Sequence, residues 1–137
     1  MERDAVERSL REFFARRSPG PAAAYLFGSV ARGTSGAGSD VDVAVLHPGG
    51  EPGTLESLAL RLEGDLGEAL RHPVQLVVLD RAPVDLVHRV LRDGVLVHEA
   101  DRSARVRFEV RARAAYFDLL PILRRYRRLD PPGRVAR

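Results

Sequence analysis

A glycine-rich stretch between residues 28 and 42 connects two apolar runs, and it limits the fold of this chain more than any other feature. The runs at 22–27 and 41–46 are short, apolar and bounded by turn residues, which predicts two buried strands. Gly28-Ser29 directly follows the first run, and Asp40-Val41-Asp42 opens the second. Polar groups therefore occupy the ends of both predicted strands, where they can face one another.

Asp40 and Asp42 are two positions apart, and side chains at positions i and i+2 of a strand point to the same face. Two carboxylates this close repel each other, so one pKa rises unless a cation lies between them. Oxygen ligands suit Mg²⁺, which commonly takes one or two carboxylates and fills its other positions with water and phosphate oxygens. The pattern makes Asp40 and Asp42 candidate metal ligands and candidate catalytic residues.

Gly28-Ser29 follows a predicted strand and opens a predicted helical turn. Backbone N–H groups and the Ser29 hydroxyl are suited to phosphate binding at such a position. Neither Gly-Ser nor Asp-x-Asp is specific alone, since the first is usual in turns and the second is common at strand ends. Separated by ten residues and bracketed by two apolar strands, together they predict a nucleotidyl-transfer site.

The rest of the chain up to residue 100 alternates between helical and strand patterns. Helices are predicted at 2–17, at 54–71 with Thr54 as the N-cap, and at 84–91, and extended segments at 74–79 and 95–97. His47 follows the second strand, and it is interpreted as a solvated loop residue or as a group at the mouth of the site. The order of elements predicts an α/β or α+β fold with a small mixed β-sheet flanked by helices.

A long helix is predicted at 101–128, and it has two apolar stripes. One stripe comprises Val106, Val110, Phe117 and Leu120; the other comprises Phe108, Ala112, Ala115, Leu119, Ile122 and Tyr126. A helix that is apolar on two faces must bury both, so one face is predicted to bind a partner chain. The alternative is that Pro121 kinks the helix and both stripes fold back on the same core.

The composition is that of an ordinary globular protein, with 137 residues, 45% hydrophobic residues and a net charge of +3. This length predicts a single domain over residues 1–137, with a core at about 20–98. All 22 basic residues are arginine, which suits phosphate and interface binding but is equally explained by codon bias in a GC-rich or thermophilic source. The absence of cysteine excludes disulfides and thiolate chemistry. With no signal peptide or membrane-length apolar run, a cytoplasmic location is expected.

The Gly28–Asp42 pattern resembles the signature of the DNA polymerase β-like nucleotidyltransferase superfamily, and more closely that of the minimal nucleotidyltransferases. The resemblance implies that Asp40 and Asp42 bind Mg²⁺ and that nucleotide is bound by Gly28, Ser29, Arg32 and Ser39. Arg32 is also interpreted as a surface arginine paired with a carboxylate. Members of the superfamily usually carry a third carboxylate on the next core strand, where this chain has Gln75. An amide cannot act as a base or as an anionic ligand. Asp80, five residues after Gln75, is expected on the opposite face of that strand from position 75.

The segments 89–94 and 108–121 extend the resemblance to the MntA-like antitoxins of type VII toxin–antitoxin systems, whose partners are HEPN-domain RNase toxins. The resemblance implies transfer of AMP from ATP to a tyrosine hydroxyl of the toxin, together with toxin binding through the helix at 101–128. An alternative is an antitoxin whose site has decayed at Gln75 and which acts by complex formation alone. A weaker alternative, terminal nucleotide addition to RNA, rests on the arginines between 102 and 113; no membrane or direct nucleic-acid contact is expected. Adenylylation of an aminoglycoside-like hydroxyl shares the motif but usually needs a larger substrate domain.

Overall fold

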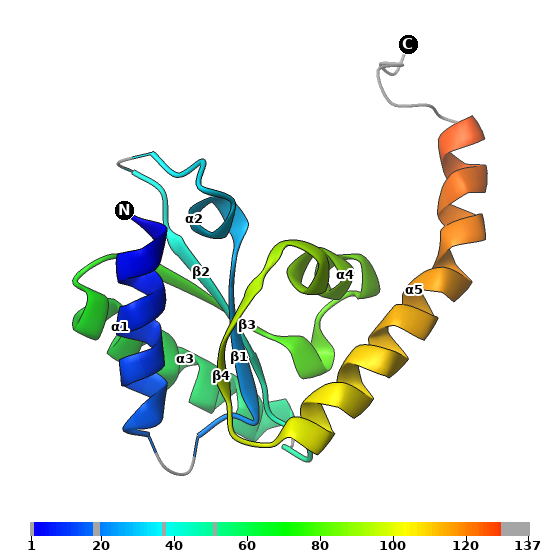
Figure 1. Ribbon diagram of the computed structural model, residues 1–137. Helices are drawn as coiled ribbons and strands as arrows, with labels where there is room; N and C mark the ends of the chain where they lie inside the picture. Colours follow the sequence, from blue (N-terminus) through cyan, green and yellow to red (C-terminus); the bar gives the residue numbers. More distant parts are fainter. Residues whose placement is uncertain (1, 18–19, 37, 51, 130–137) are drawn as a thin grey trace.

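The computed structural model describes residues 2–17, 20–36, 38–50 and 52–129, which form one mixed sheet with helices on both of its faces (Figure 1). The elements are α1 (Arg3–Ala15), β1 (Ala23–Phe27), α2 (Gly28–Arg32), β2 (Val41–Leu46), α3 (Pro52–Leu70), β3 (Val74–Val78), the 3₁₀ turn η1 (Leu79–Arg81), α4 (Val84–Asp93), β4 (Val95–Glu99) and α5 (Arg102–Leu129). The predicted fold class is confirmed: a small mixed sheet, flanking helices and a long C-terminal helix.

The four strands lie in the order β3-β2-β1-β4. β1 is antiparallel to both β2 and β4, and β2 is parallel to β3. In this register Phe27 lies opposite Asp42, and Asp42 lies opposite Gln75. The end of β1 and the beginnings of β2 and β3 therefore meet at one end of the sheet, which is where the predicted site residues are found.

Both faces of the sheet are covered, which explains why the central strands are apolar throughout. On one face, Leu26 and Val43 pack with residues of α1 and α3, including Phe14 and Leu66. On the other face, residues of β1 and β2 pack against α4 and the first turns of α5. Asp42 has the same strand parity as Ala44, so it belongs to the face that α4 covers.

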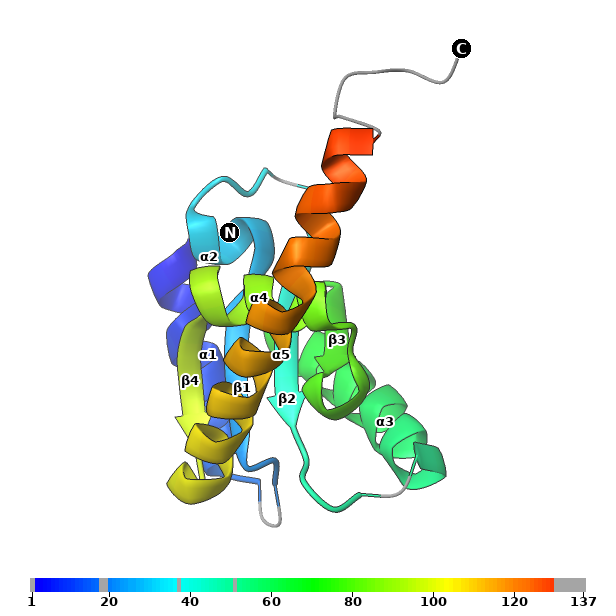
Figure 2. The ribbon, with the colours of Figure 1, turned by 90° about the vertical axis from the view of Figure 1, so that its right-hand side faces the viewer.

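The first half of α5 is attached to the sheet, and its second half extends away from the domain (Figures 1 and 2). Asp101 caps the helix, since its carboxylate accepts a hydrogen bond from the Ala104 N–H at 3.0 Å. The Tyr25 hydroxyl of β1 donates to the Glu109 carboxylate at 2.7 Å, and Arg105 donates to the same carboxylate at 2.8 Å. The helix continues through Pro121, and Ile122 and Tyr126 beyond it are exposed, so the two stripes do not fold back on the same core.

Some predicted boundaries were wrong by one or more residues. Thr54 is not an N-cap, because α3 begins at Pro52 and Thr54 lies inside the helix. The third predicted strand ends at Val78, because Leu79 begins a 3₁₀ turn. The extended segment after α4 is a true strand, since β4 pairs with β1. No helix among the described residues combines the length and apolar character that crossing a membrane requires.

Candidate active site

Gly28 brings the backbone of α2 against the carboxylate of Asp42. Its φ is +76°, a left-handed conformation that glycine adopts without strain. A Cβ atom at this position would lie 2.1 Å from Asp42 Oδ2. The start of α2 and the carboxylate are therefore in direct contact only because residue 28 has no side chain.

Asp42 and Asp40 form the acidic side of the site. Asp42 is half-buried and Asp40 is exposed. Burial raises the pKa of Asp42, the charge of Asp40 raises it further, and the positive charge of Arg32 opposes both effects. A half-buried carboxylate whose charge is disfavoured in this way, with a second carboxylate two residues away, fits a divalent cation, which would neutralise the charge.

A cavity of about 450 Å³ opens beside these residues. Its lining comes from the end of β1 and α2 (Phe27, Gly28, Ser29 and Arg32), from β2 and β3 (Asp42, Gln75 and Val77), and from α4 (Leu86, Arg89 and Asp93). The structure thus brings together three of the four predicted nucleotide-binding residues and one of the two predicted metal ligands in a single concave site. The three residues from α4 were not predicted.

Ser39, the fourth predicted nucleotide-binding residue, does not line this cavity. Its hydroxyl accepts a hydrogen bond from the Gly36 N–H at 3.0 Å, and its carbonyl lies 2.5 Å from His72 Nε2. Ser39 therefore shapes the loop that leads into β2. Arg32 faces the cavity and, among the described residues, forms no ion pair, although its charge acts on Asp42 and Asp93.

Gln75 lies beside Asp42 in the parallel register of β2 and β3, at the position where a third carboxylate was expected. Asp80 does not replace it, because Asp80 lies in η1 beyond the other end of β3 and accepts a hydrogen bond from the His47 N–H at 2.7 Å. Within the described ranges, no group of three or more acidic, histidine or cysteine side chains is placed to hold a metal. Of the predicted acidic pair, Asp42 lines the cavity and Asp40 does not, and among the described residues no carboxylate stands at position 75 to join them.

His47 is remote from the site, because it follows the end of β2 that lies away from Asp42. It is half-buried, and its Nε2 has no hydrogen-bond partner among the described residues. The predicted position at the site mouth is therefore wrong. His47 does lie in a loop, as the other interpretation had it, but it is half-buried rather than solvated.

Arg89 and Asp93 supply charge to the lining of the cavity from α4. They are four residues apart, so they share one face of the helix. Asp93 receives two hydrogen bonds from Arg92, at 2.9 Å and 2.8 Å, and these lower its pKa. The i, i+4 spacing was visible in the sequence, but nothing in the sequence indicated that this face of α4 covers the site.

The family model for polymerase beta nucleotidyltransferases matches residues 9–103, which include both strands of the site and the Asp-x-Asp pattern. The chain belongs to this nucleotidyltransferase family. No curated protein sequence matches the chain.

Several solved nucleotidyltransferase-fold structures resemble the chain over nearly its whole length. A chain in a crystal structure of a toxin–antitoxin with AMP-PNP has a TM-score of 0.67 and 26% identity, covering 90% of this chain and 93% of that one. A chain in the complex of tri-AMPylated Shewanella oneidensis HEPN toxin with MNT antitoxin has a TM-score of 0.65 and 23% identity, covering 93% of each. A chain of the toxin–antitoxin MntA-HepT has a TM-score of 0.63 and 23% identity, covering 92% of this chain and 93% of that one.

Proposed function

We propose that this nucleotidyltransferase is an antitoxin, which neutralises a HEPN-family RNase toxin by transferring AMP from ATP to a tyrosine hydroxyl of the toxin and by binding it. The observation that supports the proposal is the close approach of Gly28 to the Asp42 carboxylate. We assign the phosphates to the first and Mg²⁺ to the second. The likeness to a toxin–antitoxin chain crystallised with AMP-PNP, over 90% of this chain, supports both the nucleotide and the partner.

Each residue of the proposed site has a separate role in the reaction. Gly28 and Ser29 bind the β- and γ-phosphates, and the Arg32 guanidinium balances the remaining phosphate charge. Asp40 and Asp42 hold Mg²⁺, which when bound neutralises the charge that develops on the phosphates. The toxin's tyrosine oxygen attacks the α-phosphorus, pyrophosphate leaves, and the phenolic proton passes to solvent. The cytoplasm supplies the ATP and Mg²⁺ that this scheme needs.

In this proposal the chain has two working parts. The core at about 20–98 carries the transfer site, and the helix at about 101–128 binds the toxin. Exposed apolar side chains on α5 support the second assignment, since Ile122 is 63% exposed and Tyr126 is 69% exposed. Side chains of this size are rarely left in solvent along one helix unless another surface covers them.

A second candidate function is neutralisation by complex formation alone. Gln75 favours it, because an amide beside Asp42 supplies neither a base nor a third anionic ligand. In this case the cavity binds nucleotide at most weakly, and toxin binding through α5 accounts for protection.

The two candidates separate in one experiment on the purified chain, its toxin, ATP labelled at the α-phosphate, and Mg²⁺. Transfer of label to the toxin that is lost in Asp40→Asn and Asp42→Asn supports the enzyme. Absence of label, together with protection from the toxin that survives both substitutions, supports complex formation. Glu12→Gln, an exposed change on α1, serves as the control with an equal change of charge.

A further inference from the structure

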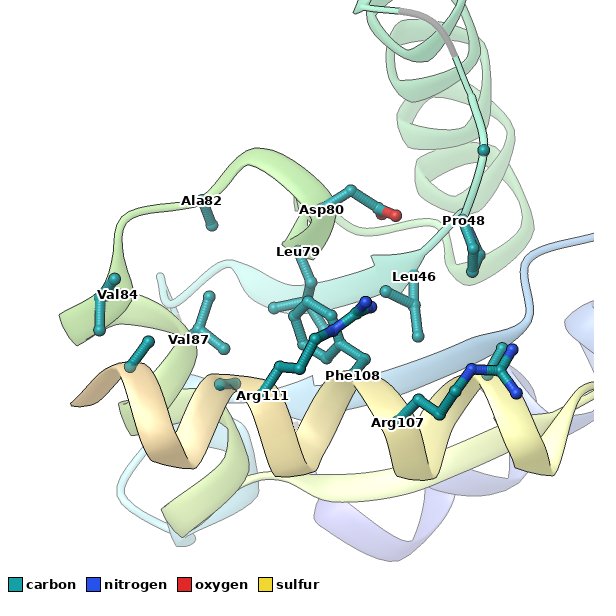
Figure 3. Close-up of a pocket in the computed structure, with 14 residues that line it drawn as sticks. Leu46, Pro48, Leu79, Asp80, Ala82, Val84, Val87, Arg107, Phe108 and Arg111 are labelled. Carbon is teal, nitrogen blue, oxygen red and sulfur yellow. The ribbon is translucent and has the colours of Figure 1, made fainter. Parts of the chain in front are cut away.

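A second cavity, of about 420 Å³, lies at the end of the sheet away from the Gly28–Asp42 site (Figure 3). Leu46 at the end of β2, Leu79 of η1 and Phe108 of α5 lie together in it, and Arg107 and Arg111 extend from α5 beside them. The cavity therefore combines an apolar interior with a basic wall, and the proposed transfer reaction makes no use of it.

The arginines of this wall differ from their neighbours on the same helix. Within the described ranges, Arg105 and Arg113 form ion pairs with acidic side chains of α5 or β4, whereas Arg107 and Arg111 form none. Asp80 also lines the cavity, but its carboxylate already accepts the His47 N–H. Two guanidinium groups thus remain available to an anionic ligand.

The cavity is the inner end of a longer apolar stripe on α5. The stripe comprises Phe108, Ala112, Ala115, Leu119, Ile122 and Tyr126, separated alternately by four and three residues. Its inner members Phe108 and Ala112 are half-buried against the domain, while Ile122 is 63% exposed and Tyr126 is 69% exposed. Eighteen residues of helix correspond to about 27 Å, and alternating spacings of three and four residues are typical of a seam that packs against another helix.

From this juxtaposition we infer that the stripe and its cavity bind an amphipathic helix of the partner toxin, with apolar side chains at the same spacing and Asp or Glu residues beside them. The acidic character follows from Arg107, Arg111 and Arg125, which flank one side of the stripe and outnumber Asp118 there. One large apolar side chain of the partner fills the cavity, since an anchor in a desolvated pocket carries much of the energy of such an interface. A second copy of this chain fits poorly, because its α5 would set arginines against arginines.

This inference rests on the proposed toxin partner, and it is tested on the complex of the full chain with that toxin. The double variant Arg107→Glu/Arg111→Glu reverses the wall of the cavity; both residues are exposed, so folding is retained. We expect the dissociation constant for the toxin to rise about 10- to 100-fold. The matched control Arg8→Glu/Arg61→Glu makes the same charge change on α1 and α3, beyond the other face of the sheet, and leaves binding within about twofold.

A photo-crosslinking benzoylphenylalanine at position 115 identifies the occupant of the stripe directly. A cross-linked toxin peptide that is helical, apolar at three–four spacing and flanked by acidic residues supports the inference. Cross-links to a second copy of this chain, to a basic peptide, or to no toxin peptide in an intact complex overturn it. If Arg107→Glu/Arg111→Glu binds the toxin as tightly as the wild type does, this inference is overturned and the proposed function stands. If the wild-type chain binds no toxin, both the inference and the proposed function are overturned.

Discussion

Gln75 lies directly opposite Asp42 in the parallel pairing of β3 with β2, so an amide stands where a third acidic ligand would complete the site. Restoring a carboxylate at this position tests how much the site has lost. In Gln75→Asp we expect the free protein to be destabilised by about 1 kcal/mol, because a third negative charge joins Asp40 and Asp42. We also expect Mg²⁺ to raise the unfolding temperature more than it does in wild type.

The measurement for Gln75→Asp is thermal unfolding with and without Mg²⁺, followed by the rate of label transfer. Gln75→Asn, which keeps the amide and shortens the side chain as Asp does, is the control. A Mg²⁺ response equal in Gln75→Asp and Gln75→Asn would show that position 75 does not face the metal site.

Asp42→Asn is expected to stabilise the free protein at pH 7 by a few tenths of a kcal/mol, after allowance for solvent screening. The folded state raises the pKa of Asp42, mainly through burial and secondly through Asp40. A carboxyl group whose pKa is raised by folding stabilises the protein fully at pH values below its unfolded pKa of 3.8. This stabilisation is lost as the pH rises through the folded pKa. At pH 7 the ionised Asp42 side chain therefore lowers the free energy of unfolding. The neutral amide of Asp42→Asn does not have this effect.

Urea unfolding at pH 7 of the wild type and of Asp42→Asn measures this difference, with Glu12→Gln as the control. Added Mg²⁺ should stabilise the wild type and leave Asp42→Asn unchanged. A loss of stability in Asp42→Asn without metal would mean that the carboxylate has a favourable contact outweighing its burial.

Gly28→Ala is expected to cost about 2–4 kcal/mol of unfolding free energy and to abolish nucleotide binding. The substitution incurs the strain of a positive φ, and its Cβ would also lie 2.1 Å from Asp42 Oδ2. Gly33→Ala is a close control, because Gly33 has a φ of +74° and a Cβ added there would meet no atom of the described residues within 4 Å. It should cost only about 1–2 kcal/mol. Equal losses in urea unfolding would show that the Asp42 contact does not restrict residue 28.

Acidification from pH 8 to pH 5 is expected to lower the free energy of unfolding, beginning near pH 6.5. Burial lowers the pKa of both His47 and His98 in the folded protein, and the Nε2 atom of each is buried without a partner in the part of the chain that the structure describes. A histidine whose pKa is lower in the folded state than its unfolded value of 6.5 does not reduce the free energy of unfolding above that pH. As the pH falls from 6.5 through the folded pKa, the free energy of unfolding decreases. His98 also stacks on Phe14, at a centroid distance of 5.4 Å.

Denaturant unfolding at several pH values measures this acid response, and His98→Phe should reduce its slope while retaining the stacking on Phe14. His72→Phe, at a ring that lies beside the Ser39 carbonyl, provides a control. An unchanged slope in His98→Phe would assign the acid response to other groups.

The strands and the site pattern could be predicted from the sequence because they depend on local information. A run such as 41–46 is apolar throughout because both faces of β2 are covered. Asp40 and Asp42 are near each other by chain connectivity alone. Arg89 and Asp93 could not be placed in the site, because only the packing of α4 across the sheet brings them to the cavity. His47 was misplaced for the related reason that strand direction carries it to the far end of the sheet.

β2 connects the two cavities described above: Asp42 lies near its start beside the candidate active site, and Leu46 ends it in the cavity that α5 lines. Four residues of strand correspond to about 13 Å. A toxin helix anchored at Leu46 would therefore be held at a fixed separation from the reacting phosphate. β2 would then fix the distance between the docked helix and the bound ATP. Only a toxin tyrosine at that distance from the docked helix would reach the α-phosphorus. Selection of the acceptor would depend on distance along β2 rather than on recognition of the sequence around the tyrosine.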